Sequence, residues 1–144
     1  METALHSTLQ SVIMVRYYKH LFLLISSLFL LCSCQEGREA GDLWGQWKMA
    51  SDNSKHVAFS GATTVFREIE GNKLIQQIYG SFQHQGDSLF IQCHSIEGDP
   101  LDTLTIENDY GFKPFTNIRL KIDKLDDDNL VLSKDNQRWS FYKY

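Results

Sequence analysis

Most of the chain consists of short runs in which apolar and polar residues alternate. Along residues 74–84, Leu74, Ile78 and Phe82 share one side of an extended chain, and residues 88–96 continue the alternation. A period of two residues is typical of a half-buried β-strand. Gln, Gly and Asp separate the two runs and supply a turn. We therefore predict a β-hairpin here.

Similar short runs continue to the end of the chain, with turn residues between them and no sustained helical period. They cover residues 43–49, 57–59, 64–69, 118–123, 130–132 and 138–144. About eight short strands joined by tight turns are typical of an antiparallel barrel or sandwich. Gly80, in the middle of the run 74–84, predicts the bulge or bend that a closing sheet needs. A barrel of eight strands either fills its interior with side chains or holds one small ligand.

The pattern fails between residues 97 and 115. Prolines at 100 and 114 interrupt the segment, and residues 101–106 are compatible with a strand or with an irregular excursion. Long irregular segments are often functional. Phe112 and Phe115 stand beside the second proline, so we expect them in a mobile lid or a contact loop.

The first part of the chain has the pattern of a secretory signal. Residues 21–31 are an apolar run of 11 residues, shorter than the ~20 that a membrane-spanning helix needs. Arg16 and Lys19 stand directly before this run, in the order that a signal peptide requires. Since residues 1–13 add nothing to that pattern, we expect translation to begin at Met14.

The sequence Leu31-Cys32-Ser33-Cys34 resembles the bacterial lipoprotein box. The resemblance implies cleavage before Cys34 and three fatty acyl chains on that residue, enough for stable membrane anchoring. Gln35 follows, rather than the Asp that retains some lipoproteins at the inner membrane, so we expect a lipid-anchored protein of the bacterial outer membrane. The expected parts are a signal peptide (1–33), a lipidated tether (34–42) and a β-barrel domain (43–144).

Composition narrows the possible partners. The formal net charge is −4, so no basic excess is available to bind a nucleic acid backbone. After cleavage and acylation at Cys34, Cys93 is the only thiol that remains, which rules out an intramolecular disulfide. Stability must then come from the hydrophobic core.

Gly45-Gln46-Trp47 resembles the G-x-W signature of the lipocalins. Four later segments resemble the small lipocalin-like lipoproteins of Gram-negative bacteria: 79–82, 86–89, 122–125 and 130–144. The resemblance covers residues 43–144 and implies an up-and-down barrel. It also implies that Gly45 and Trp47 close one barrel end, with Arg138 stacked on the indole of Trp47. The domain is shorter than a full lipocalin and shows no C-terminal helix, which argues against a deep ligand cup.

Two functions follow from this resemblance. In the first, a non-enzymatic envelope lipoprotein binds a small apolar ligand in the barrel mouth. In the alternative, the barrel is filled and docks an envelope protein or a glycan. An apolar void of ~300 Å³ or more would favour the first. The candidate contact residues are aromatic: Trp44, Tyr79, Phe90, Phe112 and Phe115.

Other chemistry finds little support. His84, Cys93 and His94 are possible metal ligands, but neighbouring residues of a strand point to opposite faces, so Cys93 and His94 do not readily share an ion or form a catalytic pair. Residues 126–128 are acidic but lack the spacing of a calcium loop, and a solvated hairpin turn is the simpler interpretation. We expect no metal, no cofactor and no enzymatic activity.

Overall fold

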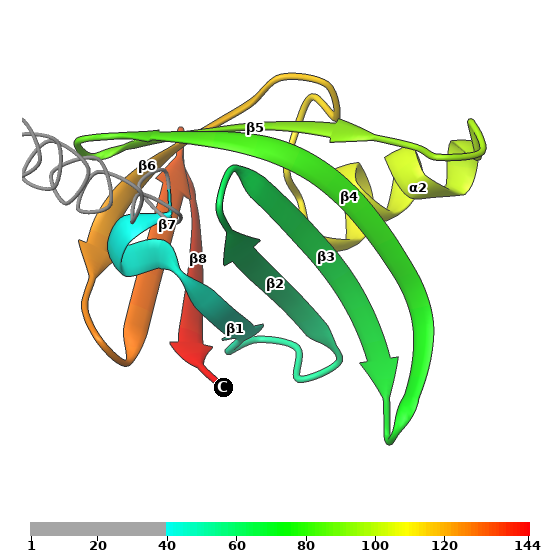
Figure 1. Cartoon of the computed structure of the whole chain (residues 1–144), viewed down its shortest axis with the longest axis horizontal. Helices are drawn as coiled ribbons and strands as arrows, with labels where there is room; N and C mark the ends of the chain where they lie inside the picture. Colours follow the sequence, from blue (N-terminus) through cyan, green and yellow to red (C-terminus); the bar gives the residue numbers. More distant parts are fainter. Residues whose placement is uncertain (1–39) are drawn as a thin grey trace, which may run out of the picture. The chain divides into compact units, whose positions relative to one another are not determined.

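Eight antiparallel strands close into a barrel in the computed structural model, which describes residues 40–144 (Figure 1). Each strand pairs with the next along the chain, and the last pairs with the first. The prediction of an all-β antiparallel barrel of about eight strands is therefore confirmed. The strands are β1 (Gly45–Met49), β2 (Lys55–Ser60), β3 (Thr63–Glu70), β4 (Lys73–Gln85), β5 (Ser88–His94), β6 (Ile118–Leu125), β7 (Asn129–Lys134) and β8 (Gln137–Lys143).

The closure between β1 and β8 decides which side chains point inward. Trp47 lies opposite Lys143, and Met49 lies opposite Phe141. Pairing the first and last strands removes both exposed edges of the sheet, which would otherwise invite aggregation. The buried apolar residues of the described part form one cluster inside this barrel, so residues 40–144 have the hydrophobic core that an independently folding domain needs.

Gly80 lies where strands approach each other closely. The register of β4 with β3 and β5 runs through Gly80 without a shift, so the bulge predicted there is absent. A Cβ added to Gly80 would lie 3.0 Å from both the Gln92 carbonyl oxygen and Thr64 Cγ2. β4 is strongly curved (Figure 1). The predicted bend is present, and glycine allows it by leaving space for the neighbouring strands.

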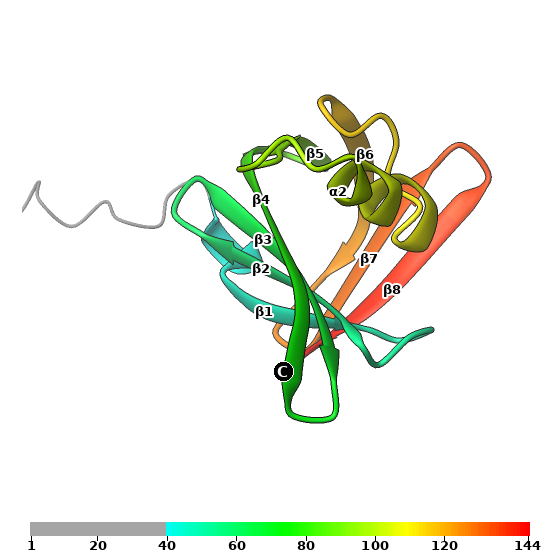
Figure 2. The same ribbon diagram turned by 90° about the vertical axis from the view of Figure 1, so that its right-hand side faces the viewer.

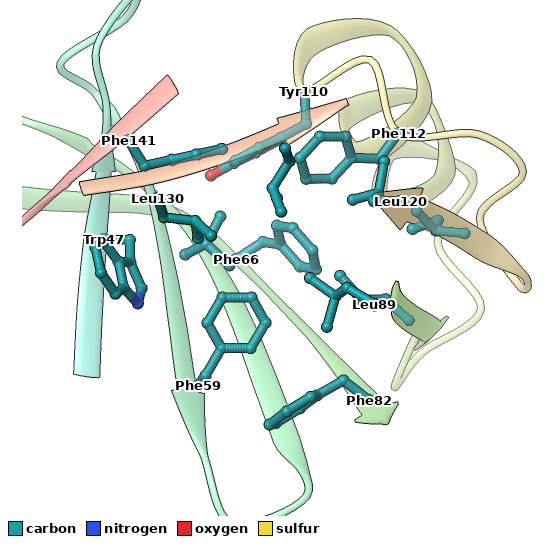
Figure 3. Packing of buried hydrophobic residues seen from close by; sticks show 14 of the residues in the cluster. Trp47, Phe59, Phe66, Phe82, Leu89, Tyr110, Phe112, Leu120, Leu130 and Phe141 are labelled. Atoms are coloured by element: carbon teal, nitrogen blue, oxygen red, sulfur yellow. The ribbon is translucent and has the colours of Figure 1, made fainter. Parts of the chain in front are cut away.

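Large apolar side chains fill the barrel interior (Figure 3). The inward positions of every strand contribute, and they follow the predicted alternation. Ring pairs such as Phe59–Phe82, with centroids 5.0 Å apart, meet edge to face. The largest fully buried side chains are Trp47, Tyr110, Phe59, Phe66 and Phe112.

The segment between β5 and β6 is partly helical, which the alternation did not predict. Residues Pro100–Leu104 form the helix α2, and Thr105–Asp109 continue it as a π-helical turn, η2. The side chain of Asp99 caps α2 by accepting a hydrogen bond of 2.9 Å from the Leu101 amide. An Asp followed by Pro is a helix-start signal. Residues 101–106 are thus helical rather than a strand. Figure 2 shows α2 at one end of the barrel.

The folded part begins slightly before the expected boundary at residue 43. Ala40 and Leu43 are buried, and Gly41–Leu43 form a short 3-10 turn, η1. Residues 40–42 therefore belong to the fold rather than to the tether. The predicted signal peptide, the start at Met14 and the lipidated Cys34 lie outside the described residues. Across residues 40–144, none of the helices is both long and apolar enough to cross a membrane.

Candidate functional site

The part of the barrel in which a ligand was expected is occupied by the chain itself. Phe112 is fully buried, and its ring centroid lies 5.0 Å from that of Trp139 and 6.0 Å from that of Phe66. It therefore packs between β3 and β8 (Figure 3). We call residues 105–112 the plug. Phe115, just after the plug, is only 8% exposed. Neither phenylalanine lies on an exposed lid or loop, because both bury apolar surface in the core.

Hydrogen bonds hold the plug against three strands. The Tyr110 hydroxyl lies 2.7 Å from the carbonyl oxygen of Arg67 on β3 and 3.1 Å from that of His56 on β2. Burial raises the pKa of Tyr110, so the phenol keeps the proton that it donates. Thr105 Oγ1 donates to Gln76 Oε1 on β4 at 2.8 Å. The plug is thus fixed by polar contacts as well as by packing.

At the barrel end that contains the G-x-W sequence, the cation over the Trp47 ring is Lys143 rather than the expected Arg138. Trp47 is fully buried, and its Nε1 donates to the Leu43 carbonyl oxygen at 2.8 Å. Lys143 Nζ lies 4.9 Å from the centroid of the Trp47 ring. Gly45 is required beside it, since its φ is +127° and an added Cβ would lie 2.9 Å from Lys143 Cε. The close approach of Lys143 explains the glycine.

Arg138 does not stack on Trp47, so that part of the prediction is wrong. Along β8 the side chains of Trp139 and Phe141 point inward, and Arg138 belongs to the opposite, outward set. Lys143 lies on the same side as Phe141, but it is half-buried at the end of the strand, where it covers Trp47 and also reaches a surface pocket. Its side chain is 66% exposed, and its Nε lies 4.0 Å from Asp123 Oδ2. The alternation along the last strand already placed Lys143 with the core residues, and this signal identifies the correct cation.

Tyr79 and Phe90 lie on the outer wall of the barrel, on β4 and β5. Tyr79 hydrogen-bonds the side chain of Gln77, and Phe90 lies beside Arg119, whose Cζ is 5.8 Å from the ring centroid. The structure therefore does not bring these two residues together with Phe112 and Phe115. The aromatic candidates belong to separate parts of the molecule.

Three pockets lie on the outside of the barrel, each with outward-facing strand residues in its lining. A pocket of about 410 Å³ lies along β4 and β5 and has no charged residue in its lining. A pocket of about 240 Å³ is lined in part by Glu97, Asp99 and Asp102. The third, of about 430 Å³, lies over β1, β2 and β3. We call it the wall groove; its lining includes Trp44, Ala58, Ser60, Thr63, Val65, Arg67, Lys143 and Tyr144.

His56 lies beside the wall groove and is buried although it faces outward. Tyr144 covers it edge to face, with ring centroids 5.4 Å apart. Burial, and then the charges of Lys48 and Arg67, lower the pKa of His56. The cross-strand register places these three side chains in one row, because Lys48 pairs with His56 and His56 pairs with Arg67. This row makes the wall basic.

The candidate metal ligands are spread over different surfaces. Cys93 points into the core, whereas His94 is exposed on the opposite face of β5. Within residues 40–144, no group of three His, Cys, Asp or Glu side chains is arranged to hold a metal ion. Asp126 accepts hydrogen bonds from the amides of Asp128 and Asn129, so it organises the β6–β7 turn. Lys124 contributes most to lowering the pKa of Asp126.

Cys93 is expected to be unreactive in the folded protein. It is 2% exposed, and burial raises its pKa from 9.0 to about 12. Modification by Ellman's reagent at pH 8 should be at least about a hundredfold slower in native residues 35–144 than in denaturant. Because the folded pKa exceeds the unfolded one, this thiol also makes stability fall as pH rises from about 9 towards 12. Equal modification rates in the two states would contradict the burial.

Comparisons with known proteins agree with this barrel. A family model described as a lipocalin-like domain matches residues 29–144. The chain is similar to a lipocalin-like protein from Bacteroides uniformis, with 18% identity and a TM-score of 0.58 over 72% of this chain and 100% of that one. An uncharacterized protein from Bacteroides eggerthii gives 15% identity and a TM-score of 0.57, over 70% and 98%. Among curated proteins, none matches the sequence significantly.

Proposed function

Because the chain belongs to the lipocalin-like domain family and its barrel interior is filled, we propose that it is a non-enzymatic envelope protein that docks a partner on its outer surface. The plug carries this proposal. Phe112 and Tyr110 occupy the space in which a small apolar ligand was expected, and both are almost completely buried. A ligand inside the barrel would have to displace both rings and break the hydrogen bonds of Tyr110.

The proposed location is the bacterial outer membrane, with a lipid anchor on Cys34. The order of the basic residues, the apolar run 21–31 and the sequence Leu31-Cys32-Ser33-Cys34 supports it. Both similar structures come from species of Bacteroides. An anchored domain meets its partners at the membrane surface, so docking needs no internal cargo.

The surroundings of Cys93, the candidate nucleophile, support a function without enzymatic activity. Cys93 faces the core and keeps its proton, and its neighbour His94 lies on the other face of the sheet. A catalytic thiol needs an accessible thiolate with a base within reach. Neither condition is met at Cys93.

Native mass spectrometry of residues 35–144, after exposure to an extract of the envelope fraction, tests the filled barrel. We expect the mass of the bare polypeptide, and the same mass after incubation with a mixture of lipids and cofactors. Denatured protein is the control for covalent additions. A discrete added mass that is lost on unfolding and matches an apolar small molecule would contradict this proposal and favour a ligand inside the barrel, whereas the mass of a saccharide or protein partner would agree with docking on the outer surface.

A further inference from the structure

The wall groove is bordered by two exposed aromatic side chains and has a floor of small residues. Trp44 is 61% exposed and Tyr144 is 74% exposed. The groove is concave because its floor has short side chains. Ser60 pairs with Thr63 across β2 and β3, and Ala58 occupies the next outward position on β2. Short side chains between two large rings leave a hollow of about 430 Å³.

The ring of Tyr144 is held in place by contacts with the outer wall of the barrel. The Tyr144 amide donates to the Gln46 carbonyl oxygen at 3.0 Å, which extends the pairing of β8 with β1. The ring rests edge to face on His56, and Lys48 Nζ lies 5.4 Å from its centroid. These contacts order the aromatic ring before any ligand arrives, which lowers the entropy lost on binding.

Within the described part of the chain, no carboxylate pairs with the cations of the wall groove. Arg67 and Lys143 line it, and Lys48 lies in the adjoining row. No Asp or Glu is part of the lining. Among residues 40–144, none of these three cations has a carboxylate oxygen within 4.0 Å. The Nε of Arg67 donates to Gln77 Oε1 at 3.0 Å, and this bond orients the guanidinium group.

The other two pockets lack this combination. The pocket of about 410 Å³ has no cation in its lining, and the pocket of about 240 Å³ is acidic. The wall groove therefore differs from both by joining exposed aromatic rings with unpaired positive charge. Its concave shape suits a narrow chain, whereas a flat bilayer would touch the rings but not the floor.

Exposed aromatic rings, a mostly apolar floor with the hydroxyls of Ser60 and Thr63, and cations without carboxylate partners match the chemistry of an acidic saccharide. Sugar rings present apolar C–H faces that stack on Trp and Tyr, and their hydroxyls can bond the Ser60 and Thr63 hydroxyls. Carboxylates on the sugars pair with a guanidinium group in bidentate geometry. We propose that the wall groove binds an acidic saccharide chain, with Trp44 and Tyr144 on the sugar rings and Arg67 and Lys143 on the carboxylates. This assignment rests on the proposed function and names its partner.

Calorimetric titration of residues 35–144 with trigalacturonate tests the proposal. We expect saturable binding, with the Trp44 indole N–H resonance shifted in the NMR spectrum and the resonance of Trp139, which packs on Phe112 away from the groove, unmoved. Trp44→Ala and Arg67→Gln should each weaken binding about tenfold. Arg119→Gln removes an exposed cation elsewhere on the barrel and should bind as the unmodified protein does. Thermal melts check that each variant folds.

Three outcomes would overturn the proposal that the wall groove binds an acidic saccharide. These are no saturable binding of trigalacturonate, equal binding of the neutral trisaccharide maltotriose, and binding only to mixed phosphatidylcholine and phosphatidylglycerol vesicles. The last would assign the wall groove to the membrane surface. Native mass spectrometry separates this failure from failure of the docking function. An unliganded barrel that ignores trigalacturonate retains the docking function and loses only the saccharide.

Discussion

Phe112→Ala should lower the free energy of unfolding by about 3–5 kcal/mol, one of the two largest effects expected for this protein. The ring is fully buried and meets Trp139 edge to face at 5.0 Å, so its removal leaves a void between β3 and β8. Urea denaturation followed by circular dichroism measures the change. A midpoint shift with an unchanged slope would show that the barrel persists with a weaker core.

The same variant should create the apolar cavity that the native barrel lacks. A small aromatic molecule such as benzene should raise the melting temperature of Phe112→Ala, because an apolar cavity of this kind binds such molecules. The unmodified protein should not respond. Phe90→Ala, which removes a partly buried ring from the outer wall, is the matched control and should change stability less. Equal effects of the two variants would contradict the plug.

Trp47→Ala should cost a similar amount, about 3–5 kcal/mol, at the opposite end of the barrel. The substitution removes a fully buried indole, its hydrogen bond to Leu43 and the ring beneath Lys143. The Leu43 carbonyl oxygen also loses its side-chain partner, which adds to the cost. Thermal denaturation should show a large fall in melting temperature.

Trp44 provides the control for this experiment within the same segment. Trp44→Ala deletes the same side chain three residues earlier, where it is 61% exposed, and should change the free energy of unfolding by less than about 0.5 kcal/mol. Lys143→Met keeps most of the side-chain bulk but removes the charge over Trp47, and should cost about 0.5–2 kcal/mol. A Trp47→Ala variant as stable as Trp44→Ala would contradict the closed barrel end.

The order and approximate bounds of the strands could be predicted from the sequence. Alternation of apolar and polar residues is a local property, and the buried residues of β5, Leu89, Ile91 and Cys93, were on one side of the predicted strand. Turn residues separated the hairpins. Gly45 and Trp47 could be assigned to a barrel end because the G-x-W sequence resembles a family signature.

The candidate site depended on contacts between distant parts of the chain. Nothing local indicates that Phe112 turns inward, since the irregular segment has no period that assigns it a face. The cation over Trp47 was wrongly assigned to Arg138. Alternation along β8 places Lys143 on the side of the core residues, but only the pairing of β8 with β1 shows that Lys143 lies opposite Trp47. The wall groove joins Trp44 to Tyr144.

Sequence alone thus determined the strand pattern and the family, because each of these depends on short motifs whose residues are close together in the chain; the anchor at Cys34 stays a prediction. Tertiary structure decided whether the barrel is hollow and where its surface is concave. Both features arise from side chains brought together across strands, as when Tyr110 on the plug bonds the backbone of Arg67. Because side chains fill the barrel interior, the candidate site that remains lies on the outer wall.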